Sequence, residues 1–112
     1  MGESARAAWP VTSPLRLEFA PGVDDEAIEA KRYHADISPE LGLAFAVELD
    51  LALKRIVANP AMWPPHVLRT RRCLLDRFTY SVVYRVVADL ITVYAVMHQH
   101  RRPDYWRRRV RG

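Results

Sequence analysis

The stretch FTYSVVYRVVADLITVYAVM, residues 78–97, decides the fold expected of this chain. It contains two apolar runs of strand length, residues 78–86 and 90–97, separated by only three residues. A third run of strand length, residues 67–75, precedes them across a gap of two residues. Connections this short join neighbouring antiparallel strands. The sequence therefore predicts two consecutive hairpins, which together form a three-stranded antiparallel meander.

Alternation along these runs predicts the face that each side chain occupies, because residues two apart on a strand point to the same side. The apolar faces consist of Phe78, Tyr80, Val82, Tyr84 and Val86 on one run, and of Ile91, Val93, Ala95 and Met97 on the next. The opposite, semi-polar face can then place Arg85, Tyr94 and His98 near one another. Arginines from residues 69–72 are expected to join them, in a register left open because Arg71 and Arg72 point to opposite sides.

Two helices are predicted upstream of the strands. The first runs from about Val23 to Ile37, with three acidic residues in its first turn that complement a helix N-terminus. Ser38 fits an N-cap and Pro39 the first helical position, so a second helix begins at once and ends at about Ala58. The two helices form an antiparallel hairpin. The strong buried face of the second helix consists of Leu41, Phe45, Leu49, Ala52, Leu53 and Ile56.

A second, offset apolar stripe on the same helix consists of Leu43, Val47 and Leu51. One helix cannot bury both stripes against one sheet. The offset stripe is therefore expected to meet the first helix, another subunit or a partner segment.

The N-terminal region completes the predicted fold. Residues 1–14 show no sustained periodicity and contain two prolines, so we interpret them as a flexible leader outside the core. Residues 15–19 alternate apolar and polar side chains, which indicates a strand with one buried face. Residues 15–112 are thus predicted to form one α+β domain: an N-terminal strand, an antiparallel helix hairpin, then a three-stranded antiparallel meander.

Charge is distributed unevenly along the chain. Residues 1–59 contain six Lys or Arg and ten Asp or Glu, whereas residues 60–112 contain eleven Arg and three Asp. Only two of the seventeen basic residues are lysines. Such a basic half favours an acidic partner, either nucleic acid or an acidic protein segment. Arginine suits bidentate contacts to carboxylate or phosphate, although codon usage in a GC-rich genome produces the same bias.

The lone Cys73 excludes an internal disulfide and any site with several cysteine ligands, and it favours a reducing, cytoplasmic setting. No apolar run approaches the roughly 18–20 residues that a membrane helix needs, so no membrane partner is expected. No metal site is predicted either. His98 and His100 lie two apart and lack nearby carboxylates or cysteines.

The segment HQHRRPDYWRRR, residues 98–109, follows the last predicted strand. It concentrates groups that can bind phosphate, stack on a base, move a proton or contact a protein. Its tyrosine and tryptophan also fit a purely structural interpretation, in which they close the edge of the sheet.

Several segments together resemble the RelE/ParE superfamily of toxins from bacterial type II toxin–antitoxin systems. The resemblance covers roughly residues 15–109. Its most specific parts are the strand pair around residues 78–85 and the ending His98…Arg101-x-Pro103-x-Tyr105-Trp106. It implies a toxin neutralised by a cognate antitoxin, whose extended or helical segment crosses the toxin. The offset stripe Leu43/Val47/Leu51 would suit such a helix.

The resemblance leaves two modes of action open. RelE-like members cleave mRNA on the ribosome, whereas ParE-like members inhibit DNA gyrase by binding. A ribonuclease would use His98 or Tyr94 for proton transfer and arginines, Arg85 among them, for charge stabilisation. The family's nucleases commonly use lysines as well, and the two lysines here, Lys31 and Lys54, lie on the predicted helices. This departure favours the ParE-like mode.

In either mode the resemblance implies a binding surface for the target or for nucleic acid. Its expected members are Arg69, Arg71, Arg72, Arg101, Arg102, Tyr105 and Trp106. No cofactor is expected. A homodimer and a toxin–antitoxin hetero-oligomer are both open, as is a third function, a non-toxic nucleic-acid-binding or protein-binding module on the same fold.

Overall fold

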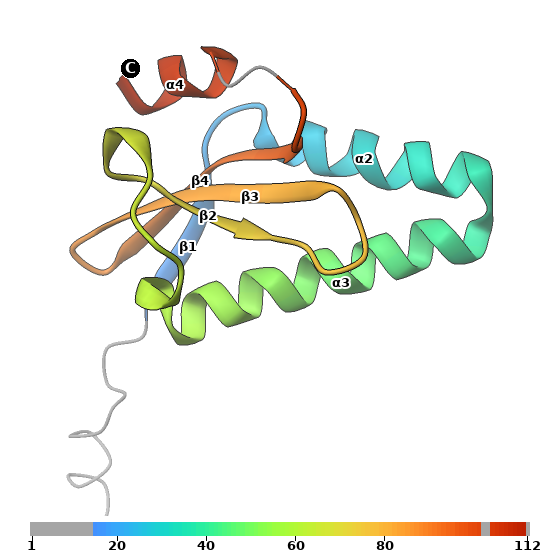
Figure 1. Ribbon diagram of the computed structural model, residues 1–112, viewed down its shortest axis with the longest axis horizontal. Helices are drawn as coiled ribbons and strands as arrows, with labels where there is room; N and C mark the ends of the chain where they lie inside the picture. The colour runs from blue at the N-terminus through green and yellow to red at the C-terminus, as the bar shows by residue number, and fades with distance from the viewer. Residues whose placement is uncertain (1–14, 102–103, 112) are drawn as a thin grey trace, which may run out of the picture.

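A computed structural model describes residues 15–101 and 104–111. The predicted leader, residues 1–14, and Arg102 lie outside them. The described chain runs β1 (Arg16–Phe19), α2 (Val23–Ile37), α3 (Pro39–Ala58), two 3₁₀ turns, β2 (Arg71–Leu74), β3 (Tyr80–Val87), β4 (Leu90–His98) and α4 (Asp104–Arg111). This order confirms the predicted α+β class. Figure 1 shows α2 and α3 on one side of the sheet and α4 on the other.

The helix hairpin begins and ends at the predicted residues. The Ser38 side chain caps α3 by accepting a hydrogen bond from the Leu41 N–H at 3.1 Å, with Pro39 at the first helical position. The two helices approach closely at Gly42. A Cβ added there would lie 2.6 Å from the Cβ of Ala35, so a larger residue would push the helices apart.

The four strands form one sheet in the order β1-β4-β3-β2. The two hairpins pair as predicted: β3 is antiparallel to both β2 and β4. β1 adds to the outer edge of β4 in the parallel direction, with Leu17 opposite Ile91. The sheet is therefore mixed, because the connection from β1 to β4 passes through the whole helix hairpin and both other strands.

The predicted strand at residues 67–75 is wrong in its first part. Val67–Arg69 instead form a 3₁₀ turn, η3, in which Leu68 and Arg69 have left-handed backbone angles, φ 57° and 61°. The turn is closed by Thr70, whose N–H and side-chain hydroxyl both donate to the Val67 carbonyl oxygen, at 3.1 and 2.6 Å. Because local hydrogen bonds hold this turn, the strand starts only at Arg71.

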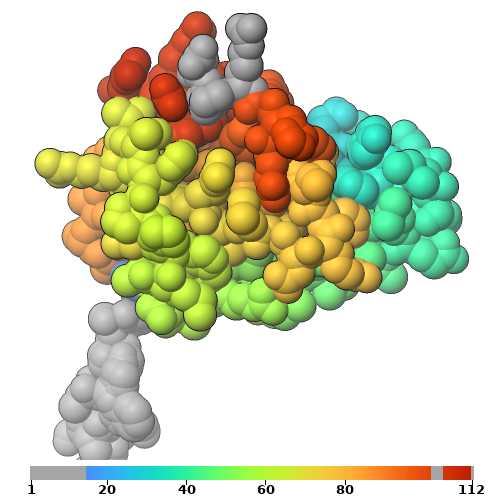
Figure 2. Space-filling view, in the orientation of Figure 1, coloured from blue at the N-terminus to red at the C-terminus, as the bar shows by residue number. Residues whose placement is uncertain are grey.

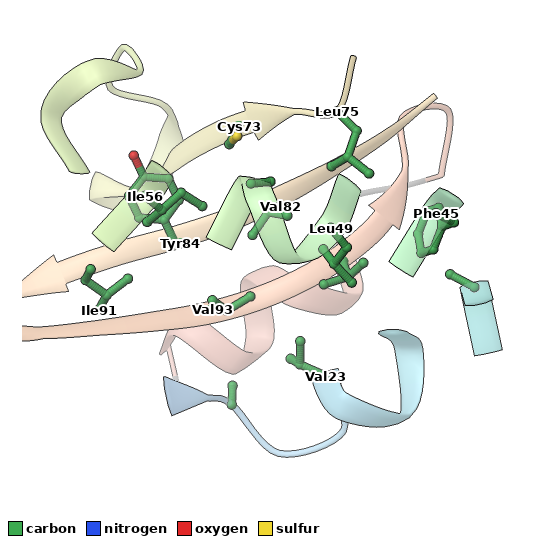
Figure 3. Packing of buried hydrophobic residues seen from close by; sticks show 14 residues of the cluster. Val23, Phe45, Leu49, Ile56, Cys73, Leu75, Val82, Tyr84, Ile91 and Val93 are labelled. Atoms are coloured by element: carbon green, nitrogen blue, oxygen red, sulfur yellow. The ribbon is translucent and has the colours of Figure 1, made fainter. Parts of the chain in front are cut away.

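The main core fills the space between the sheet and the helix hairpin (Figure 3). Side chains from α3, β2, β3 and β4 meet there. The largest fully buried members are Phe45, Ile56, Tyr84, Ile91 and Val93. Burial of one such side chain contributes roughly 1.5–3 kcal/mol to folding, so this face of the sheet carries most of the apolar stabilisation. The predicted apolar face of residues 78–86 is confirmed.

The predicted alternation of β4 holds only up to Val93. Val83 pairs with Ala95 but Tyr84 pairs with Val93, so Tyr94 is an extra residue in a β-bulge. After the bulge, each residue of β4 points to the face opposite the one predicted by strict alternation. Val96 joins the main core, whereas Ala95 and Met97 point to the other face, against Trp106 of α4. The prediction that Ala95 and Met97 share a face with Ile91 and Val93 is therefore wrong.

In the part of the chain that the structure describes, no helix is both long enough and apolar enough to cross a membrane.

Candidate functional site

His98 does not lie on the open face. After the bulge it pairs with Tyr80, and their rings lie 5.5 Å apart on the side of the helix hairpin. Its Nε2 is 2.9 Å from the Thr79 hydroxyl, and its Nδ1 accepts a hydrogen bond from the His100 N–H at 3.2 Å. Both ring nitrogens are thus already engaged within the protein.

The expected cluster of Arg85, Tyr94 and His98 does not form. Arg85 pairs with Thr92, whereas His98 pairs with Tyr80, five residues away along β3. At about 3.3 Å per residue this separates the two backbones by roughly 16 Å. Tyr94 is the bulge residue itself and packs between the two cores. The bulge moves His98 to the other face, and the distance along the strands would separate it from Arg85 on either face.

The arginines of β2 divide between the two faces. Arg71 is half-buried, and its guanidinium donates to the Trp63 carbonyl oxygen, which ties the connector (residues 59–70) to the sheet. Arg72 is exposed on the face opposite the helices, where it pairs across from Val83. Arg69 is exposed on the η3 turn. Arg69 and Arg72 are therefore available for contacts, while Arg71 already has a structural role.

A groove lies beside these arginines, with a volume of ≈ 250 Å³. Its lining residues are Trp63, Pro64, Pro65, His66, Arg72 and Leu74. The pKa of His66 is lowered, first by burial and then by the positive charges of Arg72 and Arg107. Figure 2 shows the connector and β2 on one face of the molecule, with α4 above them. Sequence reasoning missed this groove because only the η3 turn brings His66 and Arg72 to it.

The C-terminal aromatic residues differ in exposure. Trp106 is 1 % exposed and packs on Val83, Ala95 and Met97, as the structural interpretation of this segment expects. Its burial leaves no ring face for a target. Tyr105 is half-buried under Arg101, whose guanidinium lies 3.9 Å from the ring centre. Burial and the nearby Glu26 raise the pKa of Tyr105 to about 12, so its hydroxyl stays protonated.

An ion pair between α2 and α4 was not predicted from the sequence. Arg109 Nη1 lies 2.8 Å from Glu26 Oε2 and also donates to the Tyr94 carbonyl oxygen at 2.9 Å. The other oxygen of Glu26 accepts from the Val96 N–H at 3.1 Å. Both charged side chains are mostly buried, 23 % and 13 % exposed. Arg109 thus holds α4 against the bulge instead of presenting a free charge.

The offset stripe is exposed on the outer surface of α3. Leu43, Val47 and Leu51 are 64 %, 52 % and 44 % exposed, so nothing in the described chain covers them. An apolar groove of ≈ 270 Å³ runs beside the stripe between α2 and α3, and Ile28, Ala46 and Leu49 are among its lining residues. The groove is a second apolar feature of the hairpin, because none of the three stripe residues lines it.

A third cavity, of ≈ 410 Å³, lies at the end of β4 between His98, Tyr80 and the Glu29 flank of α2. Burial, and then the nearby Tyr33, raise the pKa of Tyr80, so this phenol is a weaker acid than a free tyrosine. Among the residues that the structure describes, no group of three His, Cys, Asp or Glu side chains could hold a metal ion.

Comparison with known proteins identifies the family. Residues 17–103 match the family model described as ParE toxin of type II toxin-antitoxin system, parDE. The chain is 32 % identical over 90 residues to Toxin ParE2 of two Mycobacterium tuberculosis strains, an alignment that spans 80 % of this chain and 86 % of the relative.

A solved structure shows the same fold. Its title is Chromosomal ParDE TA system from P. aeruginosa, and it matches with a TM-score of 0.66 at 21 % identity, over 78 % of this chain and 98 % of the other. The RelE/ParE resemblance is confirmed on its ParE side, and this chain belongs to the ParE family of toxins from type II toxin–antitoxin systems.

Proposed function

We propose that this ParE-family toxin acts by binding and inhibiting DNA gyrase, and that a cognate antitoxin neutralises it. One observation carries the choice of a binding mode over ribonuclease catalysis. A ribonuclease would need His98, Tyr94 and Arg85 close together. Instead, His98 pairs with Tyr80 and Arg85 lies five residues further along β3, while both nitrogens of His98 are hydrogen-bonded within the protein. General acid–base catalysis requires such groups to converge on one phosphate.

The apolar surface on the helix hairpin is the proposed antitoxin site. Leu43, Val47 and Leu51 recur every four residues along α3, which matches the repeat of an amphipathic helix laid alongside. The neighbouring groove between α2 and α3 would receive larger apolar side chains of the same segment. The solved P. aeruginosa structure is described as a ParDE system, which supports a protein partner for this fold.

Two assays run side by side test the mode of action. Purified toxin is expected to inhibit supercoiling by gyrase and to leave mRNA intact during translation. His98→Ala should inhibit gyrase as well as the unchanged protein does, because His98 lies beside Tyr80 on the side of the helix hairpin, whereas Arg72 is on the opposite face. Translation-dependent mRNA cleavage that is lost in His98→Ala would instead establish the RelE-like mode.

A double variant tests the antitoxin site. Leu43→Glu with Val47→Glu should weaken antitoxin binding by tenfold or more, since removal of central apolar contacts typically costs about 1–2 kcal/mol each. Supercoiling inhibition by the free toxin should not change. Val87→Glu, at a similarly exposed apolar residue that ends β3, is the control for an added surface charge outside α3. Unchanged antitoxin affinity in the double variant would place the site elsewhere.

A further inference from the structure

The face of the sheet opposite the helix hairpin holds several arginines without carboxylate partners. Arg69, Arg72, Arg85, Arg107 and Arg108 form no ion pair with any carboxylate in residues 15–101 and 105–111. By contrast, every ion pair found among these described residues includes a residue of the helix hairpin. Residues 59–75 contain no Asp or Glu at all. An array of uncompensated arginines favours a ligand with repeated negative charges over one with a single carboxylate.

The groove beside β2 adds apolar and aromatic surface to this charge. The groove is lined by Trp63 and two prolines from the connector and by Arg72 and Leu74, which are neighbours on the same face of β2; Leu74 is 48 % exposed. The connector that carries Trp63 is fixed to the sheet by Arg71 and by the Tyr84 hydroxyl, which donates to the Pro60 carbonyl oxygen. Single-stranded nucleic acids bind at such sites, where bases stack on flat side chains beside a cationic track.

Backbone strain and unpaired polar atoms mark the same face. Leu68 and Arg69 both adopt the left-handed conformation, which is strained for residues other than glycine. Ser81 Oγ, Trp106 Nε1 and Arg107 Nε are buried outside the groove lining, without a hydrogen-bond partner among the described residues. Strain and unsatisfied polar groups of this kind are typical of binding sites that are preformed before their ligand arrives.

We propose that this face binds single-stranded nucleic acid, with phosphates on Arg72 and Arg69 and an unstacked base in the groove between Trp63 and Leu74. The inference goes beyond the proposed function and does not depend on gyrase being the target. His66 lies at the edge of the groove, so a phosphate bound beside it would oppose the charges of Arg72 and Arg107. Binding should therefore raise the pKa of His66 from its lowered value.

Fluorescence anisotropy with a labelled deoxythymidine oligomer of about 16 nucleotides tests the charge. Arg69→Gln with Arg72→Gln should weaken binding by about tenfold or more and reduce the salt-dependence slope by about 1.4, because two phosphate contacts are lost. The matched control, Arg32→Gln with Lys54→Gln on the helix hairpin, removes the same charge and should change binding less than twofold. Equal loss in both variants would overturn the site.

A second pair of variants tests the groove. Leu74→Glu should weaken oligomer binding by about tenfold, since loss of one stacked base costs about 1–3 kcal/mol. Val87→Glu, which is similarly exposed and adds the same charge, should bind like the unchanged protein. Nuclear magnetic resonance titration of His66 with and without oligomer should show the pKa rise. An unshifted His66 pKa would overturn the proposed groove contact.

Two competitors distinguish the ligand class. A duplex of the same length should bind more weakly, because its stacked bases cannot enter the groove; equal affinity would overturn the base contact. Poly-L-glutamate of similar charge should compete poorly. If it displaces the oligomer at equal charge concentration, the face recognises acidic protein and the nucleic-acid proposal fails. Supercoiling inhibition, measured on the same variants, reports separately on the gyrase proposal.

Discussion

The two faces of the sheet are covered in different ways. On one face, α2 and α3 bury a continuous core in which Phe45, Ile56 and Tyr84 are fully buried. On the other face, the short helix α4 covers a small cluster through one large side chain, Trp106. The side chains of the first face are therefore used mainly for packing. The second leaves a groove exposed that Arg72 lines together with Trp63 and Leu74.

This difference separates stability from recognition. Apolar burial is concentrated where the helix hairpin meets the sheet, so substitutions there should unfold the whole domain. The α4 side contributes less apolar burial, and its free charges can vary at small cost to stability. The outer surface of the hairpin is separate again, because its apolar stripe points away from the core.

Truncation of one large aromatic residue on each face should reveal the largest difference in stability between the two faces. Phe45→Ala is expected to lower the free energy of unfolding by about 3–5 kcal/mol, the usual cost of such a cavity. Trp106→Ala should cost less globally, because α4 can detach while the hairpin and sheet remain folded. Urea denaturation and amide hydrogen exchange measure both effects.

In Trp106→Ala, exchange protection should be lost in α4 and kept in β3 and β4. Loss of protection throughout the sheet, or an equal fall in unfolding free energy for both variants, would mean that the two faces form one cooperative core.

Alkaline pH should destabilise the helix-covered face through its buried thiol. Burial raises the pKa of Cys73 from 9.0 to about 11, with smaller opposed contributions from Arg55, which lowers it, and Asp76, which raises it. The folded state therefore binds more protons than the unfolded state between pH 9 and 11. The contribution of Cys73 to the free energy of unfolding is fully present below pH 9. It is lost as the pH rises towards 11, and the loss is on the order of 2–3 kcal/mol at most.

Denaturation at a series of pH values checks this, with Cys73→Ala as the comparison. The variant should lose the slope that begins near pH 9. It should keep the slope above pH 10 that arises from Tyr84 and Tyr105, whose pKa values burial raises to about 12. An identical pH profile in the variant would show that the thiol does not titrate as expected.

The smallest expected effect concerns the attachment of α4. Arg109→Gln should lower the free energy of unfolding by about 1–2 kcal/mol, because it removes charge-assisted contacts to Glu26 and to the Tyr94 carbonyl oxygen. Arg108→Gln removes the same charge from an exposed position and should stay within about 0.5 kcal/mol of the unchanged protein. Equal effects would mean that α4 is held by Trp106 alone.

The sequence by itself determined the helix hairpin, both β-hairpins and the α+β class, because caps, turn residues and apolar periods are local signals. It also marked Leu43, Val47 and Leu51 as a stripe that the sheet could not bury. Sequence motifs pointed to the RelE/ParE superfamily, which the comparisons confirmed for the ParE family.

Only the tertiary structure decided where the candidate site residues point. One bulge at Tyr94 moved His98 to the helix side, and one 3₁₀ turn brought His66 beside Arg72. The sequence does not reveal this bulge, because residues 93–97 are all apolar or aromatic and fit either face of the sheet. The ion pair between Glu26 and Arg109 also could not be predicted from local sequence patterns. It joins residues far apart in sequence that meet only after α4 has packed on the sheet.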